Sequence, residues 1–99
     1  MRKITNNQLF ELMKRKNINI IDIRDEYKFK KSHIINSINI PYRYLITNPS
    51  QYLNKQDNYV IICDYGITSD DAAEKLYKLG YNVTSVVNGI SNWQYGLIS

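Results

Sequence analysis

The sequence predicts an α/β domain with a central, mostly parallel sheet of about five strands and helices on both faces. Strand-like apolar segments alternate along the chain with segments of helical periodicity. The clearest strand pattern, over 59–63, runs directly into a glycine-containing loop and then a helix. A length of 99 residues suits one domain with a single core, so residues 1–99 are expected to form one folding unit.

The first half of the chain contains the shorter elements. Thr5 and Gln8 have the spacing of a capping box, which predicts a helix from this point to about Lys16–Asn17. The nearly continuous apolar run over 18–23 is typical of a strand that is covered on both faces. The elements expected next are a short helix over 25–31 and a strand within 34–40, which Pro41 ends.

The second half contains the clearest patterns. After an undecided stretch over 42–53, with a turn or helix start at Asn48–Pro49, comes the strand over 59–63. Apolar residues at helical spacing predict a helix over 69–79, and Gly80 is well placed to end it. The remaining expected elements are a strand over 83–87 and a terminal helix over 89–95.

Composition and charge exclude several classes of protein. A single cysteine cannot form an internal disulfide. No apolar run has the length of a signal-peptide core or of a membrane span. We therefore expect a cytoplasmic protein. The net charge is +4, but the densest basic patches, 14–16 and 28–31, fall in helical patterns without interleaved aromatic residues. We interpret these patches as solvated faces and expect no nucleic-acid partner, no membrane partner and a monomer.

The position of the single cysteine carries the chemistry. Cys63 lies at the carboxyl end of a strand and faces the first turn of a helix. Unpaired N–H groups and the positive end of the helix dipole favour an anion there, so a thiolate at this position is an activated nucleophile. The neighbouring Asp64 opposes this activation, because its carboxylate carries the same sign of charge as a thiolate.

Three segments of the chain resemble the rhodanese family. Ile21-Asp22-Ile23-Arg24 is similar to the family's strand-ending Asp-x-Arg, and 33–41 is similar to its His-Ile-Pro-Gly-Ala-x-Asn-Ile-Pro. The third segment starts with the loop Cys63 through Ser69, which is followed by a helix and a strand. It ends at residues 88–93, which are similar to the family's Gly-Gly-x-x-x-Trp ending. All three occur in the family's order and at its separations, over nearly the whole chain.

The resemblance implies a sulfurtransferase that carries sulfane sulfur as a persulfide on Cys63. The donor would be thiosulfate or a persulfide, including one on a protein, and the acceptor a thiol or cyanide. No metal and no organic cofactor is implied. The backbone N–H groups of the loop would cradle the persulfide or the donor anion. The residues of this cradle are Asp64, Tyr65, Gly66, Ile67, Thr68 and Ser69.

The loop departs from the family's Cys-Arg-x-Gly-x-Arg-Ser/Thr at both arginines, which Asp64 and Thr68 replace. Arginine would hold an anionic donor through paired hydrogen bonds, whereas Asp64 would repel it. At ~6 Å and an effective dielectric of about 40, Asp64 would raise the energy of a Cys63 thiolate by roughly 1.4 kcal/mol. Asp70 and Asp71 would add further negative charge. We therefore expect weak thiosulfate activity, which arginine at both positions should raise. An alternative is that Arg24 or Arg43 supplies positive charge from a neighbouring loop.

The other candidate residues have mainly structural interpretations. We expect Asp22 and Arg24 to support the loops at the sheet edge, His33 to make a structural hydrogen bond and Trp93 to anchor the core. Tyr65 either faces the substrate or covers the cysteine.

Two other functions remain as alternatives to sulfur transfer. A phosphatase of the Cys-x5-Arg type would need arginine six residues after the cysteine, and Ser69 stands there. A non-catalytic domain that binds a partner or senses redox or sulfur state is favoured by the missing arginines. The retained Cys63 and Gly66 argue against it.

Overall fold

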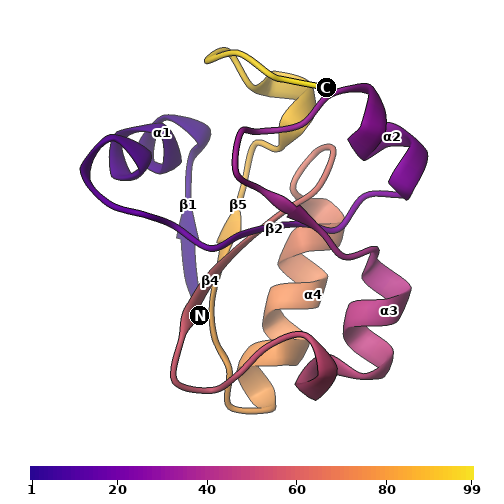
Figure 1. Ribbon diagram of the computed structural model, residues 1–99. Coiled ribbons are helices and arrows are strands. Elements are labelled where there is room, and N and C mark those ends of the chain that lie inside the picture. The colour runs from indigo at the N-terminus through magenta and orange to yellow at the C-terminus, as the bar shows by residue number, and fades with distance from the viewer.

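The computed structural model describes all residues 1–99 and shows a five-stranded parallel sheet with the strand order β1-β5-β4-β2-β3 (Figure 1). The strands are β1 (Arg2–Ile4), β2 (Ile20–Asp22), β3 (Ile38–Asn39), β4 (Asn58–Ile62) and β5 (Asn82–Val86). The α-helices are α1 (Asn6–Arg15), α2 (Glu26–Lys31), α3 (Tyr42–Thr47) and α4 (Ile67–Lys78). Short 3-10 turns follow at η1 (Pro49–Gln51) and η2 (Ile90–Asn92). The expected fold class is confirmed.

Alternation along β4 divides the core between the two faces of the sheet. Tyr59, Ile61 and Cys63 pack on one face with buried residues of α3 and α4, whereas Val60 and Ile62 pack on the other with Leu9 of α1. Helices lie on both sides of the sheet, with α1 on one side and α3 and α4 on the other (Figure 1). Because β4 is central and covered on both faces, the residue that follows it is held firmly.

Several local predictions agree with the structure. The Thr5 hydroxyl accepts the N–H of Gln8 at 3.1 Å, and the Gln8 side chain accepts the N–H of Thr5 at 2.9 Å, which is the expected capping box. Gly80 follows the end of α4 with φ +98°, a conformation that glycine adopts without strain.

Other local predictions are wrong or incomplete. The terminal helix expected over 89–95 is limited to η2, the undecided stretch forms α3 and η1, and α4 begins at Ile67 rather than Ser69. The strand β1 had no counterpart among the predicted elements. It pairs only with β5, and three residues are too few to show a period of two.

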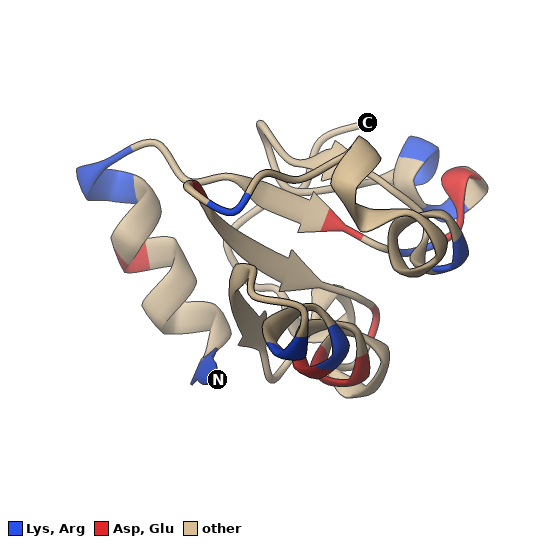
Figure 2. Ribbon diagram, turned by 90° about the horizontal axis from the view of Figure 1, so that it is seen from below, with Lys and Arg blue, Asp and Glu red and all other residues tan.

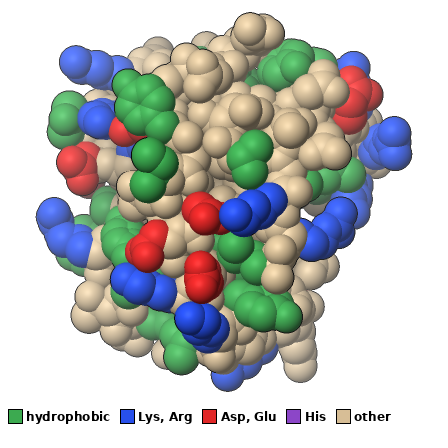
Figure 3. Space-filling model, turned by 180° about the vertical axis from the view of Figure 1, so that it is seen from behind, with side chains coloured by type: hydrophobic (Ala, Val, Ile, Leu, Met, Phe, Trp, Pro, Cys, Tyr) green, Lys and Arg blue, Asp and Glu red, His purple; other side chains and the backbone are tan.

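No helix of the structure combines the length and the apolar character that crossing a membrane requires. Basic residues lie at the end of α1 and on α2, in separate parts of the molecule (Figure 2). On the face seen from behind, acidic and basic side chains lie next to one another rather than forming an area of one sign (Figure 3).

Candidate functional site

The sulfur of Cys63 lies inside the loop that joins β4 to α4. Cys63 directly follows the last residue of β4, and its Sγ accepts hydrogen bonds from the backbone N–H groups of Gly66 and Ser69, each at 3.2 Å. The residue is only 4% exposed. Two backbone donors aimed at one sulfur at the start of a helix favour negative charge on that sulfur.

Gly66 gives the loop its shape. Its φ is +94°, and a Cβ at this position would lie 2.1 Å from the carbonyl oxygen of Val87. Only glycine fits there without displacing backbone. The fully buried Ser69 hydroxyl bonds the carbonyls of Gly66, at 3.2 Å, and Val86, at 3.4 Å. These contacts orient the two N–H groups toward Cys63.

The segment after β5 braces the same loop from outside. The N–H of Ile90 donates to the carbonyl of Cys63, and the N–H of Ser91 donates to that of Asp64, both at 2.9 Å. A Cβ on Gly89 would lie 2.4 Å from the carbonyl oxygen of Asp64, so the two backbones are in close contact. The Asn6 side chain holds this segment by donating to the carbonyl of Gly89.

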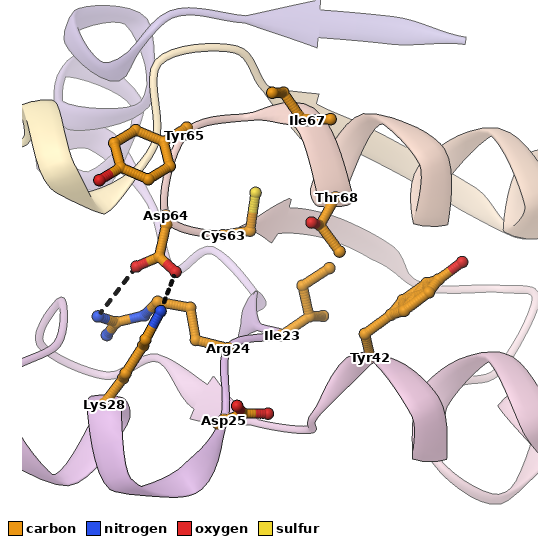
Figure 4. A pocket seen from close by; sticks show the side chains of 10 residues that line it. All are labelled: Ile23, Arg24, Asp25, Lys28, Tyr42, Cys63, Asp64, Tyr65, Ile67 and Thr68. Carbon is orange, nitrogen blue, oxygen red and sulfur yellow. Dashed lines mark hydrogen bonds and ion pairs between the residues drawn. The ribbon is translucent and has the colours of Figure 1, made fainter.

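The cysteine opens onto a pocket of about 360 Å³ between the loop and the ends of β2, α2 and α3 (Figure 4). The loop contributes Cys63, Asp64, Tyr65, Ile67 and Thr68, and the facing wall consists of Ile23, Arg24, Asp25, Lys28 and Tyr42. The pocket lies outside the carboxyl ends of parallel strands, where α/β sheets bind ligands.

Asp22 and Arg24 form an ion pair at the sheet edge. Asp22 is fully buried and Arg24 is 8% exposed, and Nη2 of Arg24 lies 2.8 Å from Oδ2 of Asp22. Nε of Arg24 donates to the same carboxylate, and Nη2 also donates to the carbonyl of Ser32 at 2.7 Å. These bonds fix the guanidinium at the edge of the pocket.

Asp64 is not the unpaired negative charge that the sequence suggested. Its Oδ2 accepts a 2.7 Å hydrogen bond from Nζ of Lys28, and its Oδ1 lies 3.9 Å from Nη1 of Arg24. The hydrogen bond and the charge of Asp64 raise the pKa of Lys28. The carboxylate points to these cations, away from the side on which Cys63 carries its sulfur (Figure 4). Lys28 and Arg24 therefore offset the repulsion that Asp64 was expected to exert on a Cys63 thiolate.

The same correction applies to the acidic residues at the start of α4. Asp70 lies 3.1 Å from Nζ of Lys3, and Asp71 lies 3.2 Å from Nζ of Lys75. The hydrogen bond from the Tyr42 hydroxyl, and then that from Lys75, lowers the pKa of Asp71. Each carboxylate thus has its own cation.

The remaining loop residues form the mouth of the pocket. Tyr65 is 67% exposed and Ile67 is 79% exposed. Tyr65 therefore projects into solvent at the edge of the pocket, while Thr68 lies on its wall (Figure 4).

The two other residues named from the sequence lie away from this pocket. His33 bonds the carbonyl of Phe29 through Nδ1 at 2.7 Å and stacks on that ring. Trp93 packs against the core that includes Leu9. Both arrangements are the structural ones expected.

Sequence reasoning missed two parts of the site. Lys28 was interpreted as part of a solvated face, because nothing local signals a partner 36 residues away. Gly89 was recognised only as part of a family motif, without its role behind the loop. The positions of Lys28 and Asp64 on a helix and a loop at the same sheet edge could have suggested their pairing.

Three comparisons relate this chain to known proteins. A model of the family described as "Rhodanese-like domain" matches residues 5–95. A thiosulfate sulfurtransferase GlpE from Shewanella oneidensis is 32% identical over 91 residues, covering 88% of this chain and 86% of the relative. The GlpE of Coxiella burnetii is 28% identical over 94 residues, covering 94% and 87% respectively.

A crystal structure from Staphylococcus saprophyticus superposes with a TM-score of 0.92 at 29% identity and covers all of both chains. A rhodanese-related protein from Thermoplasma volcanium gives 0.88 at 32% identity, covering 99% of this chain and 98% of that one. With the family model spanning nearly the whole chain, this protein belongs to the rhodanese-like domain family.

Proposed function

We propose that this protein is a sulfurtransferase that carries sulfane sulfur as a persulfide on Cys63. One observation supports this most: Sγ of Cys63 accepts two backbone N–H groups at 3.2 Å and lines an open pocket. A nucleophile needs both stabilisation of its charge and access to a substrate. Relatives named thiosulfate sulfurtransferase support the same class of reaction.

The proposed reaction has two displacement steps. The Cys63 thiolate attacks the outer sulfur of the donor, and the donor's S–S bond breaks. Its electron pair leaves on sulfite, when the donor is thiosulfate, or on a thiolate, when the donor is a persulfide. An acceptor thiolate then attacks the outer sulfur of the Cys63 persulfide, and the Cys63 thiolate leaves. Neither step requires an external oxidant or reductant.

The chain's own groups have distinct roles in these steps. The N–H groups of Gly66 and Ser69 stabilise charge on Cys63 both before the attack and after release. The bracing by Ile90 and Ser91 keeps the loop in place while the outer sulfur is gained and lost. The exposed mouth at Tyr65 and Ile67 leaves the pocket accessible to a small donor or to a thiol on another protein.

Intact-mass analysis of the reduced protein tests the proposal. After incubation with thiosulfate, or separately with glutathione persulfide, the protein should gain the mass of one sulfur atom, and Cys63→Ser should gain none. No gain from either donor, with the thiol still open to alkylation, would contradict the proposal and favour a non-catalytic binding domain.

A further inference from the structure

The pocket beside Cys63 contains two cations that share one carboxylate. Nζ of Lys28 lies 2.7 Å from Oδ2 of Asp64, and Nη1 of Arg24 lies 3.9 Å from Oδ1 (Figure 4). Both cations come from the segment that follows β2, outside the cysteine loop. Each oxygen of the Asp64 carboxylate therefore faces a different positive group.

We propose that Lys28 and Nη1 of Arg24 form an anion-binding position of the pocket, which Asp64 occupies in the free protein. A donor with an anionic group must displace this carboxylate before the two cations can bind it. The inference deepens the proposed sulfurtransferase function and rests on it for the identity of the donor. Asp64 thereby determines which class of sulfur donor the protein accepts.

Arg24 is held so that only one of its nitrogens faces this position. Nε and Nη2 donate to the buried Asp22, and Nη2 also donates to the carbonyl of Ser32. These contacts fix the plane of the guanidinium and leave Nη1 directed at Asp64. One half of the position is therefore rigid.

Lys28 forms the adaptable half. Its side chain is 41% exposed and that of Asp64 is 28% exposed, so both can turn away from each other into solvent. A sulfonate or carboxylate group has oxygens spaced to accept from both cations, as the Asp64 carboxylate does. Lys28 can thus exchange Asp64 for a ligand. The displaced carboxylate turns into solvent, so no charge is left buried without a partner.

The two cations of this position carry no net positive charge to offer in the free protein. Arg24 and Lys28 carry two positive charges, their partners Asp22 and Asp64 carry two negative ones, and Asp25 on the same wall adds one more negative charge. A dianionic donor such as thiosulfate therefore meets no net attraction until Asp64 moves. Neutral or cationic persulfides need no such displacement and should be used in preference.

A single variant and a double variant together test the inference. Asp64→Asn frees the two cations, and its KM for thiosulfate should fall about tenfold, or ~1.4 kcal/mol in binding. Adding Lys28→Met to Asp64→Asn should abolish that gain. If Asp64 acts only by repulsion, the gain will survive the loss of Lys28, and this result would overturn the inference.

Matched controls come from the same helix. Glu26 and Lys30 form an exposed ion pair on α2 at 3.0 Å, outside the pocket. Glu26→Gln and Lys30→Met repeat the two charge changes and should leave the KM for thiosulfate within twofold of the native value. The KM for cysteamine persulfide, whose ammonium group is repelled by the two cations, should not fall in any variant. Equal effects of the control pair would mean that only net charge matters and would contradict the inference.

Sulfate provides a readout that needs no sulfur transfer. Titration of isotope-labelled Asp64→Asn should shift the backbone amide signals of 64–69 to saturation, with much weaker binding in the native protein and in Asp64→Asn/Lys28→Met. Such binding without persulfide formation in any variant would support the anion position and contradict the proposed function. Equal sulfate binding by the native protein and Asp64→Asn would overturn the inference.

Discussion

Replacing Gly89 with alanine tests the bracing of the cysteine loop. Gly89 has φ +85° and ψ 176°, a region that only glycine populates readily, at a cost of about 1–3 kcal/mol for other residues. The new Cβ would also lie 2.4 Å from the carbonyl oxygen of Asp64 and 2.7 Å from the backbone nitrogen of Tyr65. Neither neighbour is the end of a flexible side chain, so the backbone must shift, which costs another ~1–3 kcal/mol.

Together these two effects predict a loss of roughly 2–6 kcal/mol, a large part of the ~5–15 kcal/mol typical of small domains. Urea unfolding followed by the fluorescence of Trp93, the single tryptophan, measures the loss. Gly80→Ala is the control: its φ is +98°, but its Cβ would meet only the Lys55 side chain, at 3.6 Å. Gly80→Ala should therefore lose only about 1–2 kcal/mol.

The folded Gly89→Ala protein should also form persulfide more slowly than Gly80→Ala, because the displaced backbone lies next to Cys63. If both variants lose the same stability, the close contact between the two backbones does not support the loop, and the reasoning is refuted.

Three further substitutions have defined outcomes. Arg24→Met leaves the buried Asp22 carboxylate without its ion pair and should cost about 3–5 kcal/mol in urea unfolding; a loss below 1 kcal/mol would contradict a structural role. Ser69→Ala keeps the N–H that donates to Cys63 but removes three hydrogen bonds of its hydroxyl, including the one accepted from the buried Ser85, so it should lose about 1–3 kcal/mol yet still form persulfide. Hydrogen bonds from Tyr42 and Lys75 lower the pKa of Asp71, so its stabilising contribution is present above its ordinary pKa of 3.8 and disappears as pH falls through the lowered value. Asp71→Asn should therefore lose less stability than the native protein between neutral and acidic pH, and equal losses would contradict the pairing.

Local patterns were sufficient to predict the elements that place the cysteine. The capping box at Thr5 involves neighbours three residues apart, and the apolar run of β4 leads directly to Cys63. The alternation of strands and helices predicted the parallel sheet and therefore the edge at which the cysteine lies.

Long-range contacts account for what the sequence left open. The pairing of β1 with β5 joins the two ends of the chain, and the ion pair of Lys28 with Asp64 joins α2 to the cysteine loop. Both depend on the order of strands in the sheet, which local periodicity does not contain. The charge around Cys63 was therefore misjudged, because Asp64 was identified but its partner Lys28 was not.

A chase with labelled sulfur tests the central claim most directly. Thiosulfate carrying a heavy isotope only in its outer sulfur is incubated with the protein, the donor is removed, and glutathione is then added. We predict that the label is first found on Cys63, that the released sulfite is unlabelled, and that the label moves from Cys63 to glutathione. Label that reaches glutathione without ever residing on Cys63, or label that stays on the protein in Cys63→Ser, would contradict the account.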